Sequence, residues 1–232
     1  MRQVPYWPVT LEHGDIVLRP IRQKDRVEWT TVRQRNKDWL QPWEASNPNP
    51  GGRLPSYREM VSSLRTQARQ GSALPFVITE RRPGLAAPAI VGQLTVSNIM
   101  WGSAMMASIG YWVDQDRAGR GIVPTAVALA TDFCFEELGL HRMEINIRPE
   151  NTPSLRVVEK LGFRPEGLRP AFLHINGEWA DHLSFALTAD EVPGGVLNRW
   201  LTSRCVTGAV ISRRVGRHTR SNGQACGEHP LT

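Results

Sequence analysis

The chain has 232 residues, 41% of them apolar, and a formal net charge of +6. This length fits one sizeable α/β domain, and two small domains would also fit. The sequence has no run of about 18 apolar residues and no apolar N-terminal stretch of the signal-peptide kind, so we expect a cytoplasmic protein that does not enter a membrane.

The three cysteines, Cys134, Cys205 and Cys226, are too widely spaced for a disulfide framework or a zinc site. We therefore expect no bound metal. Cys134 lies in an apolar helical stretch, and we expect it to be a small buried side chain.

Most of the positive charge lies at the C-terminal end. Six arginines and one glutamate follow residue 195, so five of the six net charges belong to this segment. We expect residues 196–232 to form a basic extension that is poorly ordered, because it has no core of its own. A weak contact of this extension with RNA is the alternative.

The N-terminal third predicts one strand followed by helices. The expected elements are a strand at 15–20, a helix at 25–36 capped by Asp25, a helical stretch with Trp39, Leu40 and Trp43, a loop at 47–55, and a helix capped by Ser56 with Glu59 in the capping-box position.

The remainder predicts strands joined by two helices. The expected strands are 74–80, 90–100, 104–113, 141–148, 163–173 and 179–187, and the helices are 122–138 and 152–161. Asn176-Gly177 is typical of a hairpin turn between the last two strands. The order indicates one mixed α/β domain over residues 10–190.

The junction Arg117-Ala118-Gly119-Arg120-Gly121-Ile122 lies between a strand and a long apolar helix. The first N–H groups of a helix are unpaired and its N-terminus is electropositive, while glycines let a diphosphate approach the backbone. The junction could therefore bind a diphosphate, or it could be only a tight turn. A Walker loop is excluded because no Gly-Lys-Ser/Thr triplet is present, and a dinucleotide fingerprint is excluded because Pro124 stands where its third glycine belongs.

Several motifs around this junction resemble those of the GNAT acetyltransferase superfamily, and within it the RimJ/RimL-type ribosomal-protein N-terminal acetyltransferases. The matching segments are Leu18-Arg19-Pro20, Trp39-Leu40-x-Pro42-Trp43-Glu44, the strand and glycine loop, Asn151-x-x-Ser154, Glu159-Lys160-Leu161-Gly162-Phe163 and Ile175-Asn176-Gly177-Glu178-Trp179-x-Asp181-His182. The resemblance spans about residues 10–190. It implies a GNAT fold, with a central mixed, mostly antiparallel sheet of about seven strands flanked by helices.

The resemblance also implies acetyl-CoA as the co-substrate. The expected coenzyme-binding residues are Trp112, Val113, Arg117, Ala118, Gly119, Arg120, Gly121, Ile122, Asn151 and Ser154. Ala118 and Val123 depart from the family's usual loop, so we expect backbone N–H groups to hold the diphosphate. Asn151 could instead serve as a helix N-cap.

The resemblance places Ser154 near the coenzyme sulfur, where it could protonate the leaving thiolate; its alternative is a polar residue in the first helical turn. The general base is less defined, because Asn146 and Val158 stand where relatives place a glutamate and a tyrosine. Glu44 is our candidate base, and Glu144 or a water chain are alternatives. We expect His182 to form a structural pair with Asp181.

The predicted activity is acetyl transfer to a protein N-terminal α-amine, with a ribosomal protein as the expected partner. Two alternatives remain at this level: a small-molecule amine acetyltransferase, and a non-catalytic CoA-binding sensor or ribosome-associated module. The sequence fits a monomer or a homodimer.

Overall fold

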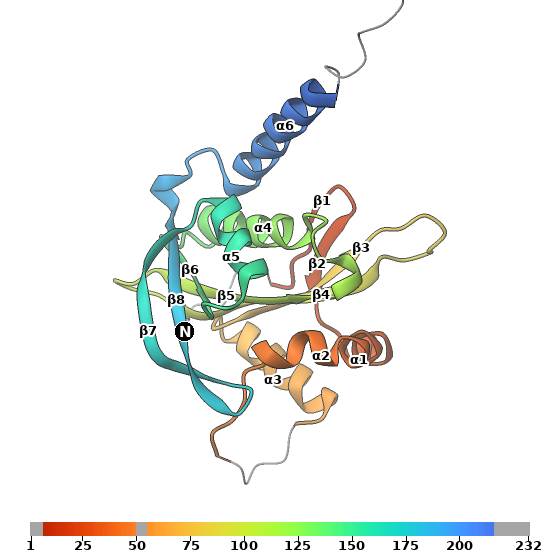
Figure 1. Cartoon of the computed structure of the whole chain (residues 1–232). Helices are drawn as coiled ribbons and strands as arrows, with labels where there is room; N and C mark the ends of the chain where they lie inside the picture. Colours follow the sequence, from red (N-terminus) through yellow and green to blue (C-terminus); the bar gives the residue numbers. More distant parts are fainter. Residues whose placement is uncertain (1–6, 50–54, 216–232) are drawn as a thin grey trace, which may run out of the picture. The chain divides into compact units, whose positions relative to one another are not determined.

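The computed structural model describes residues 7–49 and 55–215, and the side chains of the last helix as far as residue 205 (Figure 1). The chain divides into two compact units, Met1–Trp200 and Leu201–Thr232. Within the described residues, no helix is long and apolar enough to cross a membrane.

One sheet of eight strands forms the centre of the first unit. The strands are β1 (Leu11–His13), β2 (Ile16–Pro20), β3 (Leu74–Glu80), β4 (Ala89–Met100), β5 (Met106–Val113), β6 (Arg142–Ile147), β7 (Arg164–Ile175) and β8 (Glu178–Thr188), in the order β1-β2-β3-β4-β5-β6-β8-β7. Neighbours are antiparallel except β5 and β6, which are parallel. The expected mixed, mostly antiparallel sheet is confirmed, and β1 is the strand that raises its count to eight.

Helices cover both faces of the sheet (Figure 1). On one side lie η1 (Gln23–Asp25), α1 (Arg26–Arg35), α2 (Lys37–Leu40), η2 (Gln41–Trp43) and α3 (Tyr57–Arg69). On the other side lie α4 (Ile122–Glu136) and α5 (Thr152–Leu161). The remaining helical elements are η3 (Gln115–Arg117), η4 (Ala189–Glu191) and α6 (Val196–Val215). α4 is buried along most of its length because it is apolar on nearly every side.

Two local predictions are confirmed by hydrogen bonds or backbone angles. Ser56 and Glu59 form the capping box that begins α3. Asn176 and Gly177 have φ angles of 49° and 92° and form the turn between β7 and β8. Cys134 is buried as expected, and burial raises the pKa of its thiol.

The prediction for Asp25 is wrong. Its side chain accepts the Arg22 backbone N–H at 2.8 Å and pairs with Arg19 at 2.7 and 3.0 Å, and it makes no capping hydrogen bond to α1. The guanidinium from β2 competes for the carboxylate, so Asp25 joins β2 to η1.

The first compact unit includes the start of α6. The first turn of α6 is packed, with Val196 and Trp200 both buried. The basic extension therefore begins with an ordered turn. Its last part, residues 216–232, lies outside the described residues.

β5 and β6 separate along their length. They pair only at Met106–Ser108 and Arg142–Glu144, although β5 continues to Val113 and β6 to Ile147. The sheet therefore opens at the carboxyl ends of these two parallel strands, where the glycine loop follows β5.

Candidate active site

The loop between β5 and α4 has the backbone needed to bind an anion. Gly119 and Gly121 have φ angles of 76° and 83°, a region in which only glycine is unstrained. Gly121 is the N-cap of α4, and as a glycine it has no side chain that could cap the helix. The first turn of α4 contains no acidic residue. The first N–H groups of α4 thus remain available at an electropositive helix end.

The loop is anchored at its base by a buried carboxylate. Asp114 accepts a hydrogen bond from Asn36 Nδ2 at 2.9 Å and is ion-paired with Arg35, while Asn36 Oδ1 accepts the Gln115 N–H at 2.8 Å. Burial alone would raise the pKa of Asp114, but the hydrogen bonds from Arg35 and Asn36 outweigh it and lower the pKa. No pattern in the sequence connects residues so far apart, and sequence reasoning missed this anchor.

The two loop arginines lie differently. Arg117 borders the cavity described below, whereas Arg120 does not. The Arg117 and Arg120 side chains lie 3.8 and 3.9 Å from the two carboxylate oxygens of Glu80. Arg120 can therefore contribute its backbone and charge to the loop, but its side chain lies outside the cavity wall.

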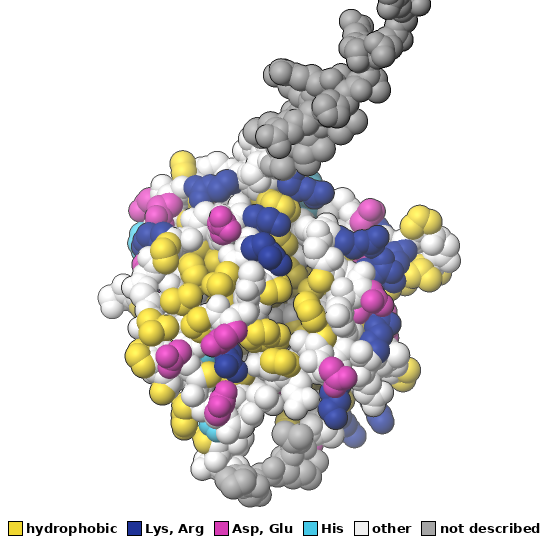
Figure 2. Space-filling model, viewed as in Figure 1, with side chains coloured by type: hydrophobic (Ala, Val, Ile, Leu, Met, Phe, Trp, Pro, Cys, Tyr) yellow, Lys and Arg dark blue, Asp and Glu magenta, His cyan; other side chains and the backbone are white. Residues whose placement is uncertain are grey.

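A cavity of about 500 Å³ begins at this loop and extends past the end of β5 and the start of α5 to the segment around Glu44. It brings together Glu44 and every predicted coenzyme-binding residue except Arg120. Figure 2 shows apolar side chains gathered at the middle of this face, with Lys and Arg side chains beside them. Sequence reasoning missed two cations that also line it, Arg156 and Lys160, whose i, i+4 spacing on the predicted helix could have indicated a shared face.

One side of the cavity is formed by the glycine loop and α5, and we call it the donor side. It contains Ser154 at the start of α5. Asn151 caps this helix by accepting the Ser154 N–H at 3.1 Å, so the N-cap alternative for Asn151 is realised. The Tyr111 hydroxyl is buried and lacks a hydrogen-bond partner of normal geometry; Ser154 is the polar side chain that faces it. Burial raises the pKa of Tyr111, and the nearby Ser154 offsets only part of this effect.

The opposite side of the cavity is aromatic and contains one ion pair. Glu44 is paired with Arg33, whose guanidinium lies 5.1 Å from the Trp112 ring centre and 5.7 Å from that of Trp29. Burial lowers the pKa of Arg33. Trp39 and Trp43 complete this wall, and Trp39 donates to the Val113 carbonyl at 3.2 Å.

The segment that carries Glu44 is fixed by the β7–β8 hairpin. The Asn176 N–H donates to the Glu44 carbonyl at 2.9 Å, and the Ser46 N–H donates to the His174 carbonyl at 2.9 Å. The Ser46 hydroxyl also contacts His174 Nδ1 at 2.9 Å. The hairpin predicted from Asn176-Gly177 thus positions the candidate base.

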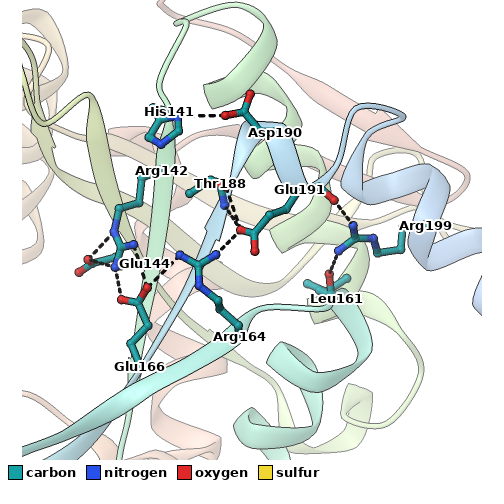
Figure 3. Close-up of polar contacts among 10 residues, drawn as sticks. All are labelled: His141, Arg142, Glu144, Leu161, Arg164, Glu166, Thr188, Asp190, Glu191 and Arg199. Atoms are coloured by element: carbon teal, nitrogen blue, oxygen red, sulfur yellow. Dashed lines mark hydrogen bonds and ion pairs between the residues drawn. The ribbon is translucent and has the colours of Figure 1, made fainter.

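The alternative polar residues are engaged elsewhere. Glu144 is buried and paired with Arg142 at 2.7 Å (Figure 3). The expected Asp181–His182 pair is not formed, because Asp181 accepts the Ala171 N–H at 2.8 Å and His182 Nδ1 contacts the Ala180 carbonyl at 3.0 Å. Burial lowers the pKa of His182. Among the residues described by the structure, no group of three or more His, Cys, Asp or Glu could hold a metal ion.

Comparison with known proteins agrees with this geometry. Residues 15–164 match the model of the acetyltransferase (GNAT) domain. The chain is 28% identical over 190 residues to the [ribosomal protein uS5]-alanine N-acetyltransferase of Escherichia coli, covering 80% of this chain and 94% of that protein. It is 29% identical over 177 residues to the probable N-acetyltransferase YjcK of Bacillus subtilis, covering 76% and 96%.

A solved structure shares the whole domain. Mycobacterium smegmatis RimJ, solved in complex with CoA-disulfide, superimposes with a TM-score of 0.76 and 39% identity, covering 85% of this chain and 95% of that one. The family model and this level of identity over nearly a complete relative establish the family: the chain belongs to the GNAT acetyltransferases and is an N-acetyltransferase.

Proposed function

We propose that this protein transfers the acetyl group of acetyl-CoA to the N-terminal α-amine of a protein, and that the acceptor is a ribosomal protein in the cytoplasm. The observation that carries the proposal is the continuous cavity, which joins an anion-binding helix end to an aromatic pocket with a carboxylate. The names of the relatives support the acceptor class: one acts on alanine of ribosomal protein uS5.

The donor side fits the phosphates of coenzyme A. The bare N-terminus of α4 would bind the diphosphate through backbone N–H groups, with Arg117, Arg156 and Lys160 as nearby cations. The pantetheine arm would then follow the opening between β5 and β6 and bring the thioester toward Ser154. Coenzyme A in the RimJ structure supports this assignment of the donor.

The reaction needs no covalent enzyme intermediate. The neutral amine attacks the thioester carbonyl carbon, the C–N bond forms, and the tetrahedral oxyanion collapses as the C–S bond breaks. Ser154 donates its hydroxyl proton to the departing thiolate. The attacking nitrogen loses one proton as the amide forms, and this proton returns to the Ser154 hydroxyl through water. Ser154 is suited to this role because its own N–H is held by Asn151 while its hydroxyl faces the cavity residue Tyr111.

Glu44 would receive the acceptor. In the structure the Glu44 carboxylate is ion-paired with the Arg33 guanidinium. An incoming ammonium group carries the same charge and can take the place of this guanidinium. The carboxylate then takes the proton that the amine must lose, directly or through water, before attack. The tryptophans around it would hold a short N-terminal segment against apolar surface.

The test is acetylation by the purified full-length protein of a synthetic peptide with the N-terminal sequence of uS5, followed by mass spectrometry. We expect one acetyl group on the α-amine and none on the same peptide with a blocked N-terminus. Spermidine and an amino sugar serve as competing acceptors.

Two outcomes would replace this proposal. Acetylation of a small amine but of no peptide would make the protein a small-molecule acetyltransferase. Tight binding of acetyl-CoA without turnover on any amine would make it a coenzyme-binding sensor or ribosome-associated module. If the protein binds RNA in a salt-sensitive way and deletion of residues 201–232 abolishes this binding, the RNA contact belongs to this part of the basic extension.

A further inference from the structure

The first turn of α6 lies beyond the part of the chain that matches the GNAT family model, residues 15–164. This turn is fixed on α4. Asp132 Oδ1 accepts the Val196 N–H at 2.7 Å, and Asp132 Oδ2 accepts the Leu197 N–H at 3.0 Å. A carboxylate that accepts two N–H groups at a helix N-terminus determines where the helix begins and how it is oriented.

Trp200 follows one turn later and connects α6 to the glycine loop. Its side chain is 5% exposed, and its Nε1–H donates to Thr125 Oγ1 at 3.0 Å. The Thr125 hydroxyl in turn donates to the carbonyl of Gly121 at 2.9 Å. Gly121 is the N-cap of α4 and lines the cavity, so a continuous chain of two hydrogen bonds joins Trp200 to the loop.

The direction of these hydrogen bonds matters. A threonine in a helix can donate to the carbonyl four residues before it or rotate away. An indole N–H can only donate, so its contact with Thr125 leaves the single hydroxyl proton for Gly121. Trp200 thereby fixes the rotamer of Thr125. The Thr125 hydroxyl then adds a second hydrogen bond to the carbonyl of the left-handed Gly121, which also accepts the backbone N–H of Thr125 at 3.1 Å.

The same indole also contacts α5. Lys160 Nζ lies 5.9 Å from the Trp200 ring centre, at the outer limit of a cation–π contact, and Lys160 lines the cavity. The neighbouring Arg199 donates to the carbonyls of Leu161 and Glu191, as Figure 3 shows, and so holds the end of α5 against this turn. Both helices that border the donor side of the cavity therefore contact the first turn of α6, residues 196–200.

We propose that Trp200 is a positioning residue for the coenzyme, which sets the N-terminus of α4 and the ammonium group of Lys160 for the phosphates of the donor. This inference rests on the proposed donor site. It does not depend on the acceptor, because the contacts of Trp200 that carry it, with Thr125 and Lys160, lie on the donor side.

The experiment measures binding of coenzyme A itself to the full chain by calorimetry, so that no acceptor is needed. Trp200→Phe keeps a ring near Lys160 but removes the N–H, and Thr125→Val removes the hydroxyl at nearly constant volume. Loss of one buried hydrogen bond corresponds to roughly a 3- to 10-fold weaker affinity. We expect each single variant to weaken the affinity for coenzyme A by this factor.

The double variant distinguishes a chain of hydrogen bonds from two separate effects. If both residues act through Gly121, Trp200→Phe with Thr125→Val should lose little more affinity than either single variant. Trp179→Phe is the control, because Trp179 lies in the β7–β8 hairpin and is 59% exposed. It should bind coenzyme A as the unaltered protein does.

Thermal unfolding without ligand separates positioning from anchoring. The proposal is overturned if Trp200→Phe lowers Tm but leaves the affinity for coenzyme A unchanged, because Trp200 would then only attach α6. Additive losses in the double variant would also contradict it. If the unaltered protein does not bind coenzyme A at all, the proposed donor site fails instead, and that result is separate from the role of Trp200.

Discussion

Asn151 and Ser154 are three residues apart at the start of α5, and the structure gives them different contacts. The Asn151 side chain caps the helix, whereas the Ser154 side chain lies in the cavity beside Tyr111. Because the cap uses the backbone N–H of Ser154 and not its hydroxyl, stability and catalysis can be altered separately at these two positions.

Ser154→Ala should lower kcat by at least about 100-fold if the hydroxyl is the leaving-group acid, which is the low end of general acid catalysis. Its Tm should stay close to that of the unaltered protein, because the backbone cap from Asn151 remains. Steady-state kinetics with acetyl-CoA and a thermal melt check this. A kcat within threefold of the original would remove Ser154 from the mechanism.

Asn151→Ala, unlike Ser154→Ala, should lower the stability of the protein. Loss of an N-cap side chain typically costs about 1 kcal/mol of the free energy of unfolding. Urea denaturation of the two variants measures this difference. An equally stable Asn151→Ala protein would mean that the cap contributes nothing, and a role of Asn151 in binding the coenzyme would then explain its presence.

Glu44→Gln removes the charge opposite Arg33 and keeps the shape of the side chain. We expect the affinity for coenzyme A to be unchanged and kcat/KM for the acceptor to fall by at least about tenfold, because the amine loses its proton acceptor. Glu178→Gln is the control, since Glu178 is an exposed residue of the hairpin, 3.7 Å from Arg148. Equal kinetics in both variants would favour a water chain as the base.

At the scale of elements, the close approach of β4 and β5 fixes the end of β5 that borders the cavity. A Cβ atom on Gly92 would lie 2.3 Å from the Trp112 carbonyl oxygen and 3.2 Å from Val113 Cα, both of them backbone atoms. These atoms cannot move without shifting the strand. Gly92 is therefore required by space rather than by its φ angle.

Gly92→Ala should destabilise the protein by about 1–3 kcal/mol, the usual cost of overpacking, and weaken the binding of coenzyme A by displacing Trp112 and Val113. Gly110→Ala is a matched control on β5, because a Cβ there has no heavy atom within 4 Å. Urea denaturation and calorimetry of both variants test the claim. Equal stability of the two would show that β4 and β5 can separate at no cost.

The elements themselves could be predicted because each has a local cause. The alternation along residues 141–148, the apolar run of α4 and the Asn-Gly turn all act over a few residues, and the structure contains each of them. Asp25 was mispredicted because the guanidinium of Arg19, on the preceding strand β2, decides where its carboxylate points. The helix-capping pattern considers only the residues that follow Asp25 and does not include an arginine on the preceding strand.

At the scale of the whole molecule, the candidate site depends on contacts between remote segments. The sequence places the glycine loop, Asn151, Ser154 and Glu44 in their elements, and all of these residues except Arg120 line one cavity. The pairing of Arg33 with Glu44, the anchoring of Asp114 by α1 and the contact of Trp200 with Thr125 bring together residues that no periodicity connects. These contacts explain how the site is held, and only the folded chain reveals them.

A network of ion pairs connects β6, β7 and η4 (Figure 3). This network makes the stability of the whole domain depend on pH. Arg142 pairs with Glu144 and Glu166, and Arg164 pairs with Glu166 and Glu191. The hydrogen bond from Arg164 is the main cause that lowers the pKa of Glu191 to about 2, and Arg142 lowers that of Glu166. A carboxylate whose pKa is lower in the folded state stabilises the fold above its unfolded pKa, about 4.3, and this stabilisation is lost as the pH falls.

The contribution of this network to the free energy of unfolding should therefore be nearly constant between about pH 7 and 5 and should decline from about pH 4.5 toward 2. His182, whose pKa is lowered by burial, adds a separate decline that begins near its unfolded pKa of about 6.5. Glu191 is partly exposed, so salt should weaken the effect. Glu191→Gln and Arg164→Met should each make the decline shallower, because each removes the same ion pair. Urea titrations at a series of pH values measure the slope, and variants as steep as the unaltered protein would assign its acid sensitivity to carboxylates outside this network.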